Sequence, residues 1–233
     1  LVPRGLNRDF DNELLGLGHF PSQDGWMIDA ENRTGGFVEV TGYGLDYAVS
    51  DGAVIDGGIR ALALNGAPAP ASMNQWLTYE AETPAAGVTD LYFGMSFEAE
   101  SIGVSADPHE LFLRLDGWGA YVAVKLYEGN LEIPGTDPVS FAAEGTEALA
   151  GVTHRVVGRL STDEDGFITG MSAWLNPAHA DMATPVVEAA MDGSTHISEI
   201  TTIELRSQKA ATVVDNLTFG TSWSQVVPPL PAD

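Results

Sequence analysis

Short stretches of alternating apolar and polar residues, separated by glycine and proline, run through most of this sequence. Leu111-Phe-Leu-Arg-Leu115 alternates, and residues 121–127 alternate again after Asp116-Gly-Trp-Gly119. Because strand side chains point to opposite faces in turn, this pattern predicts two antiparallel strands joined as a hairpin. A second hairpin is predicted from 154–160 to 167–175. The 26 glycines and 13 prolines leave few segments long enough for a helix.

Further strands and one helical turn are predicted from the same pattern. The strands are expected at 36–41, 60–65, 75–82, 91–99, 200–207 and 212–220, and the helical turn within 142–150. Many short antiparallel strands with few helices are typical of two sheets packed face to face. We therefore expect an all-β fold, a two-sheet antiparallel β-sandwich of the jelly-roll type.

The length of 233 residues suits one large all-β domain or two small ones. Residues 1–5, Leu-Val-Pro-Arg-Gly, match the remainder of a thrombin-cleavable tag and are left out of the argument. We expect a single jelly-roll domain over residues 6–226. The proline-rich residues 227–233 then read as a linker, which predicts other domains in a longer chain.

Acidic residues outnumber basic ones by 33 to 10, so the formal net charge is −23. Such a surface repels nucleic acid and anionic lipid, and no apolar run approaches the roughly 20 residues needed to span a membrane. The acidity fits a salt-rich habitat or the binding of cations by oxygen ligands. The chain has no cysteine, which excludes disulfides, thiolate metal sites and a cysteine nucleophile.

Several segments of the sequence occur in a familiar order. They are Phe10-Asp11, Gly25-Trp26, Gly44-Leu-Asp-Tyr47, residues 111–117, 156–160 and 172–177, and the closing stretch Val214-Asp-Asn-Leu-Thr-Phe-Gly-Thr-Ser-Trp-Ser-Gln-Val226. The ordered set resembles the concanavalin A-like (LamG-like) jelly-roll domains of bacterial secreted and surface proteins. The resemblance implies glycan binding or adhesion outside the cell, and a structural calcium ion near the chain ends.

An aspartate in the last predicted strand stands where the core is expected. With strict alternation, Val213, Leu217 and Phe219 share one face of the strand, and Asp215 falls on that face. An ionised carboxylate facing the core is costly unless it is paired. The partner could be an arginine such as Arg206, backbone N–H groups beside a bulge, or a bound cation.

Calcium is the cation that the resemblance implies, because in the resembled domains it commonly ties the first strand to the last. The expected ligands are Asp9, Asp11 and Asp215, since calcium needs only two or three carboxylates beside carbonyl oxygens. A weaker candidate is the loop of Asp163 and Asp165, which opens like a calcium-binding loop. Its twelfth position is serine where a bidentate glutamate is expected, so an acidic hairpin turn is the competing interpretation.

Aromatic and polar residues around the first hairpin form a candidate glycan site. Sugar rings stack on exposed aromatic rings, while nearby polar groups bond the hydroxyls. Trp118 lies in the predicted turn, and Tyr121 and Tyr127 lie on the strand face opposite the apolar residues. Together with Arg114 and Asp116 they are the expected ligand-binding residues. The competing interpretation is that the two tyrosines only cover the sheet or pack under a loop.

Signatures of catalysis are weak in this sequence. The Glu-x-Asp-x-x-Glu pattern of jelly-roll glycosidases is absent. The stretch Glu204-Leu-Arg-Ser-Gln208 matches only part of the residue pattern of a polysaccharide-lyase site. We therefore expect a non-catalytic carbohydrate-binding or adhesion domain whose partner is a polysaccharide or glycoconjugate. The alternatives are a lyase or glycoside hydrolase of the same fold, and a structural spacer or protein-interaction module.

Overall fold

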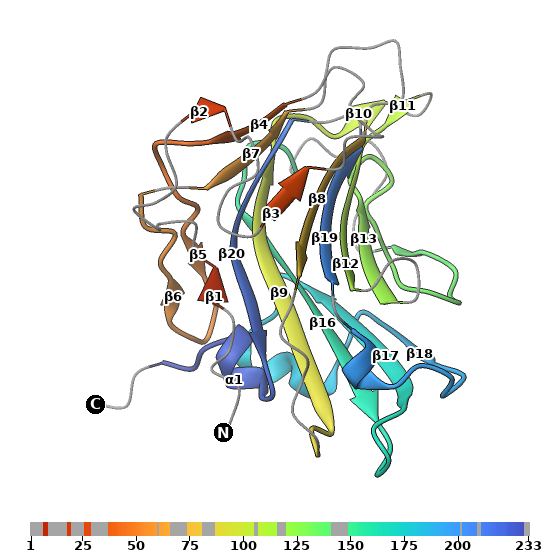
Figure 1. The fold of residues 1–233 in the computed structure, drawn as a ribbon. Coiled ribbons are helices and arrows are strands. Elements are labelled where there is room, and N and C mark those ends of the chain that lie inside the picture. Colours follow the sequence, from red (N-terminus) through yellow and green to blue (C-terminus); the bar gives the residue numbers. More distant parts are fainter. Residues whose placement is uncertain are drawn as a thin grey trace.

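The computed structural model consists of two large antiparallel β-sheets packed face to face (Figure 1). It describes residues 7–8, 18–19, 26–28, 37–59, 61–65, 74–80, 87–104, 107–115, 120–140, 149–200, 202–208 and 211–230. The predicted all-β, two-sheet sandwich is confirmed. Each predicted strand is found at or within two residues of its expected bounds, while most of the predicted helical turn at 142–150 lies outside the described residues.

Sheet A is the larger sheet and has nine strands among the described residues. Their order across the sheet is β18 (Val187–Ala190), β17 (Ile168–Leu175), β16 (His154–Thr162), β9 (Asp90–Ala99), β20 (Thr212–Gly220), β7 (Leu62–Asn65), β4 (Phe37–Val40) and β2 (Gly18–His19). The ninth, β1 (Asn7–Arg8), pairs with β20 through Asn7 opposite Thr218 and Arg8 opposite Leu217. The first and last strands, β1 and β20, therefore lie side by side. This is the arrangement that the expected calcium site between them requires.

Sheet B has seven strands within the described part of the chain. Their order is β15 (Val139–Ser140), β14 (Asn130–Glu132), β13 (Ala120–Lys125), β12 (Glu110–Leu115), β19 (Thr202–Gln208), β8 (Asn74–Glu80) and β3 (Trp26–Ile28). The predicted first hairpin is β12–β13, and β19 pairs with the other edge of β12.

Two small ribbons and three short helices complete the described structure. They are β5 (Tyr47–Ala48) with β6 (Val54–Ile55), β10 (Gly103–Val104) with β11 (Asp107–Pro108), the 3-10 helices η4 (His179–Ala183) and η5 (Ile197–Glu199), and α1 (Trp223–Val226). No helix in these described ranges is long and apolar enough to cross a membrane.

The main core fills the space between the two sheets. Alternate residues of strands in both sheets point into it, for example Leu111 and Leu113 from β12 in sheet B and Phe93 and Met95 from β9 in sheet A. These side chains are at most 1% exposed. Burial of apolar surface on this scale is the dominant favourable term in folding. The alternation read from the sequence thus sets which side chains face outward on each sheet.

A second core covers part of the outer face of sheet A. It consists of Tyr47, Val49, Tyr92, Val157, Trp174, Trp223, Val226 and Val227. Segment 41–59 and α1 supply the cover, and Figure 1 shows α1 beside the end of β20. Val227 is fully buried, and the carbonyl of Pro228 accepts a hydrogen bond from the N–H of Ala53. The chain therefore packs on the domain beyond Val226, the boundary expected from the sequence.

Candidate functional site

Arg114 and Glu204 form the centre of the outer face of sheet B. They lie opposite each other on β12 and β19, and their neighbours Leu113 and Leu115 point into the main core. Arg114 Nη1 lies 2.9 Å from Glu204 Oε2, with the side chains 2% and 16% exposed. Burial lowers the pKa of Arg114, and the charge of Glu204 opposes that shift. The pair thus holds an almost fully buried guanidinium beside a partly exposed carboxylate on the outer face of the sheet.

Tyr121 stands opposite Arg114 on the neighbouring strand β13. Its hydroxyl donates a hydrogen bond of 2.9 Å to Glu132 Oε1, and its ring centre is 6.1 Å from that of Phe112. Burial, followed by the hydrogen bond to Glu132, raises the pKa of Tyr121 to about 12. Tyr121 is therefore a neutral phenol at physiological pH, able to form hydrogen bonds but unsuited to act as a base.

Glu132 also binds a lysine, so it bridges two partners. Lys125 Nζ lies 2.8 Å from Glu132 Oε2. Burial alone would lower the pKa of Lys125, but the hydrogen bond and charge of Glu132 outweigh it and raise the pKa. We call Arg114, Tyr121, Lys125, Glu132 and Glu204 the sheet B face. It combines fixed donors and acceptors for sugar hydroxyls with the partly exposed ring of Tyr121, which packs on the buried ring of Phe112.

Two of the five sequence-predicted ligand-binding residues meet on this face, namely Arg114 and Tyr121. Tyr127 follows the end of β13 and packs against the main core. Asp116 and Trp118 lie outside the described residues.

Sequence reasoning missed Glu132, Lys125 and Glu204 as members of the same face. Lys125 could have been found, because it lies an even number of residues from Tyr121 on one strand. The two glutamates come from other strands, and their position depends on the register of β14 and β19. The register also places Arg206 opposite Phe112 on β12 and opposite Trp76 on β8. The side chains of Arg206 and Trp76 lie outside the described part of the structure.

A bulge in β20 explains the position of Asp215. Asp215 pairs with Ser96 and Thr218 with Gly94, so two residues of β20 oppose one of β9. Asn216 adopts a left-handed conformation there, with φ of 48°. The alternation shifts at this point, and Val214 joins Leu217 and Phe219 in the main core in place of Val213. The sequence assignment of Asp215 to the core-facing side was thus wrong, because strict alternation fails at a bulge.

Asp215 is nevertheless completely buried, because the second core and segment 41–59 cover it. Its Oδ2 accepts a hydrogen bond of 2.8 Å from the N–H of Leu45, and its Oδ1 one of 2.7 Å from the N–H of Asn216. Of the three partners left open by the sequence, backbone N–H groups beside a bulge are present.

The positive charge near Asp215 comes from Arg155, which is fully buried. Burial lowers the pKa of Arg155 to about 10, while the charge of Asp215 opposes this shift, so Arg155 stays charged at neutral pH. Its guanidinium donates hydrogen bonds to the carbonyl of Val226 at 2.9 Å and to Thr218 Oγ1 at 3.1 Å. Arg155 thereby ties β16 to β20 and α1.

The described surroundings of Asp215 are N–H donors and a guanidinium, which are not calcium ligands. Asp9 and Asp11 lie outside the described residues. In the hairpin turn between β16 and β17, Asp163 Oδ1 accepts hydrogen bonds from the N–H groups of Asp165 and Phe167, at 3.0 and 2.9 Å. This geometry is that of a capped turn. Among the described residues no group of three or more histidine, aspartate or glutamate side chains is placed to hold a metal ion.

Comparison with known proteins shows which known fold this chain resembles. No protein-family model and no curated protein sequence matches this chain. The solved structure of the cellulose-induced protein Cip1 is similar, with a TM-score of 0.53 and 14% sequence identity over 93% of this chain and 97% of that one. The predicted concanavalin A-like jelly roll is confirmed.

Two carbohydrate-binding proteins give lower scores. A lectin from Bauhinia forficata in complex with GalNAc has a TM-score of 0.46 at 10% identity, over 94% of this chain and 99% of that one. The carbohydrate recognition domain of Emp47p has a TM-score of 0.45 at 10% identity, over 90% and 98%. The similarity to Cip1, at 14% identity, establishes the fold and no activity.

Proposed function

We propose that this chain is a non-catalytic carbohydrate-binding domain and that the sheet B face is its binding surface. The observation that carries the proposal is the pre-arranged network in which Glu132 holds Tyr121 and Lys125 while Arg114 holds Glu204. Sugar hydroxyls both donate and accept hydrogen bonds, so they can bond to carboxylate oxygens and to cationic N–H groups at once. Since these side chains are already held in place, binding a glycan orders few of them further.

The biological setting is part of the same proposal. A net charge of −23 makes nucleic acid and anionic membranes poor partners and leaves neutral polysaccharides or glycoconjugates as the favoured ligands. We place the domain outside the cell, secreted or at the cell surface, within a longer chain that carries other domains. The neighbour Cip1 is named for induction by cellulose, which makes plant cell-wall glucans the first ligands to test.

The test is a glycan array with the intact chain, followed by calorimetric titration of the glycans that bind. Tyr121→Ala and Glu132→Gln should each weaken binding at least about tenfold, since each loses a hydrogen bond involving a charged group. The matched control is Glu164→Gln, which changes the net charge equally at an exposed hairpin tip. Absence of glycan binding would contradict the proposal. Equal glycan affinities of Tyr121→Ala, Glu132→Gln and the control Glu164→Gln would contradict it as well.

The alternative functions make different predictions. A lyase of this fold needs a tyrosine or histidine base, and the raised pKa of Tyr121 argues against that residue. The histidine side chains that the structure describes form hydrogen bonds away from the sheet B face. His109 bonds with Ser101, His154 with Asn176, His179 with Val227 and His196 with Ser198. Release of unsaturated or reducing sugar ends on incubation with polysaccharide would establish an enzyme, and a spacer would bind no glycan.

Calcium stabilisation is a separate proposal. The first strand pairs with the last, and Asp9 directly follows Arg8, which lies opposite Leu217. Calcium bound through Asp9, Asp11 and Asp215 would raise the melting temperature by mass action. Because Asp215 already accepts two backbone hydrogen bonds, Asp9 and Asp11 would have to supply most of the binding. The melting temperature with calcium and with a chelator tests this, and an unchanged value rules calcium out.

A further inference from the structure

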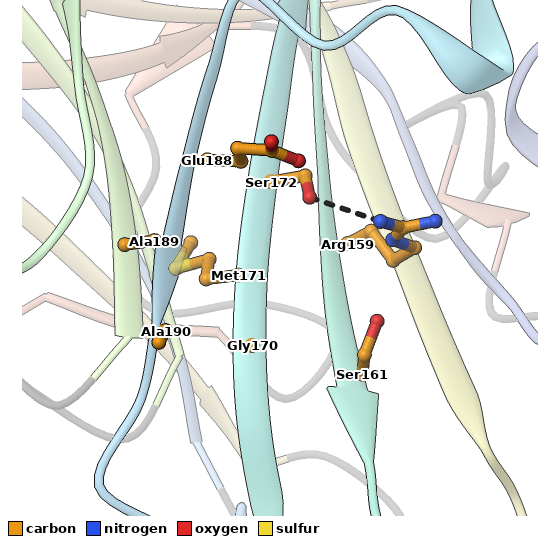
Figure 2. A pocket seen from close by; sticks show the side chains of 8 residues that line it. All are labelled: Arg159, Ser161, Gly170, Met171, Ser172, Glu188, Ala189 and Ala190. Atoms are coloured by element: carbon orange, nitrogen blue, oxygen red, sulfur yellow. Dashed lines mark hydrogen bonds between the residues drawn. The ribbon is translucent and has the colours of Figure 1, made fainter.

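A polar depression lies on the outer face of sheet A, on the opposite side of the molecule from the sheet B face. It has a volume of about 390 Å³ and crosses β16, β17 and β18. Figure 2 shows the side chains that line it, chiefly Arg159, Ser161, Gly170, Ser172, Glu188 and Ala190. Protein sites for small ligands commonly have volumes of about 300–1,000 Å³, so this depression has room for a short glycan segment.

Strand register arranges the lining residues in two rows. Arg159, Ser172 and Glu188 lie opposite one another across the three strands and form a charged row. In the adjacent row, Gly170 lies between Ser161 and Ala190. The side chains in this second row are small, and they form the floor of the depression.

Arg159 is held in place but keeps free donors. One Nη donates a hydrogen bond of 3.0 Å to Ser172 Oγ, and Nε lies 3.9 Å from Asp90 Oδ1. The guanidinium carbon lies 5.7 Å from the centre of the Trp174 ring. A guanidinium has five N–H donors, so most of those on Arg159 remain for a ligand. The side chain is 27% exposed, which gives a ligand access to them.

Glu188 faces the same space from the edge strand. It is exposed, and no hydrogen bond or ion pair holds its carboxylate among the described residues. Figure 2 shows Glu188, Ser172 and Arg159 in line across the strands. The row therefore offers the acceptor of Glu188 and the donors of Arg159 to the vicinal hydroxyls of a sugar, while Ser172 between them is only 3% exposed and positions Arg159.

Gly170 has no packing reason to be glycine. A Cβ added there would lie 3.7 Å from the carbonyl of Ala189 and 3.8 Å from Ser161 Cβ, which are ordinary contacts. Glycine within a strand is unfavourable and often marks the close approach of a ligand or another backbone. Its missing side chain leaves the floor of the depression open.

We infer that this depression is a second carbohydrate site, which binds one or two rings of a neutral glycan. The inference rests on the proposed function and extends it to two sites. A neutral ligand is favoured because Asp90 and Glu188 flank Arg159 and would repel an anion. Since the two sheets pack through the main core, the two sites face opposite directions. One domain could then hold two glycan chains, or gain avidity on a multivalent surface.

The test is an NMR titration of the isotope-labelled intact chain with cellohexaose, xylohexaose and mannohexaose. Amides around Ser161, Gly170 and Ser172 should shift as one set, and those around Tyr121 as another. Gly170→Val should abolish the first set, weakening binding there at least tenfold, and leave the second set and the fold unchanged. Thr169→Val, an exposed neighbour that does not line the depression, is the matched control.

The outcomes separate the two proposals. Shifts confined to the Tyr121 region, or a first set unaffected by Gly170→Val, overturn the second site while the proposed function stands. Shifts confined to the set around Ser161, Gly170 and Ser172, and abolished by Gly170→Val, establish the depression and overturn the sheet B face as the binding surface. Absence of shifts with all three oligosaccharides overturns both.

Discussion

Replacing Asp215 with alanine removes a fully buried carboxylate that balances the charge of Arg155. It also leaves the N–H groups of Leu45 and Asn216 without their acceptor. Leaving one buried N–H donor without its acceptor costs about 1–3 kcal/mol, so the loss of both acceptors should cost about 2–6 kcal/mol. A domain of this size loses about 2–4 °C of melting temperature per kcal/mol, so the melting temperature should fall by roughly 4–24 °C.

Guanidinium unfolding followed by tryptophan fluorescence measures this loss, because Trp174 and Trp223 lie in the adjacent second core. Asp163→Ala is the matched control: this carboxylate also accepts two backbone N–H groups, but in an exposed turn where water can replace it. The reasoning is refuted if Asp215→Ala costs no more than Asp163→Ala.

Three further predictions concern the two cores. Burial lowers the pKa of His154 below its ordinary 6.5, so the free energy of unfolding should fall as the pH drops from about 6.5 through the folded-state pKa. His154→Gln should flatten that dependence in denaturant unfolding between about pH 7.5 and pH 5. Gly158→Ala places a Cβ 2.2 Å from Phe93 Cζ and should cost about 1–3 kcal/mol, whereas an unchanged melting temperature would show that the ring moves freely. Trp223→Ala should cost about 3–5 kcal/mol in the same unfolding assay and leave glycan affinity at the sheet B face unchanged, while a parallel loss of affinity would link the two.

The strands and the sandwich could be predicted because strand alternation is a local property. The same logic placed Arg114 and Tyr121 on one outward face, since they lie on the two strands of one hairpin. Glu204 and Glu132 could not be added, because the register between strands distant in sequence is set by packing. Their contribution to the sheet B face is visible only once β19 and β14 are paired.

The sequence did not predict the second core, and it left the bulge as one of several alternatives. The run Leu91-Tyr-Phe-Gly-Met-Ser-Phe97 is apolar on one face and carries no charged residue on the other, which favours burial on both sides of a sheet. It could have predicted the cover over sheet A. The alternation of residues could not decide for the bulge at Asn216, since the bulge depends on the hydrogen bonds that Asp215 and Asn216 form with the backbone of Leu45. A shift of one residue there reverses which side chains face the core.

The sheet B face as a sugar-binding surface is tested most directly by a crystal structure with an oligosaccharide selected on the glycan array. The account predicts sugar hydroxyls within hydrogen-bonding distance of at least two of Tyr121, Lys125, Glu132 and Glu204. An oligosaccharide bound elsewhere, with this face free of sugar and open to solvent, would contradict it.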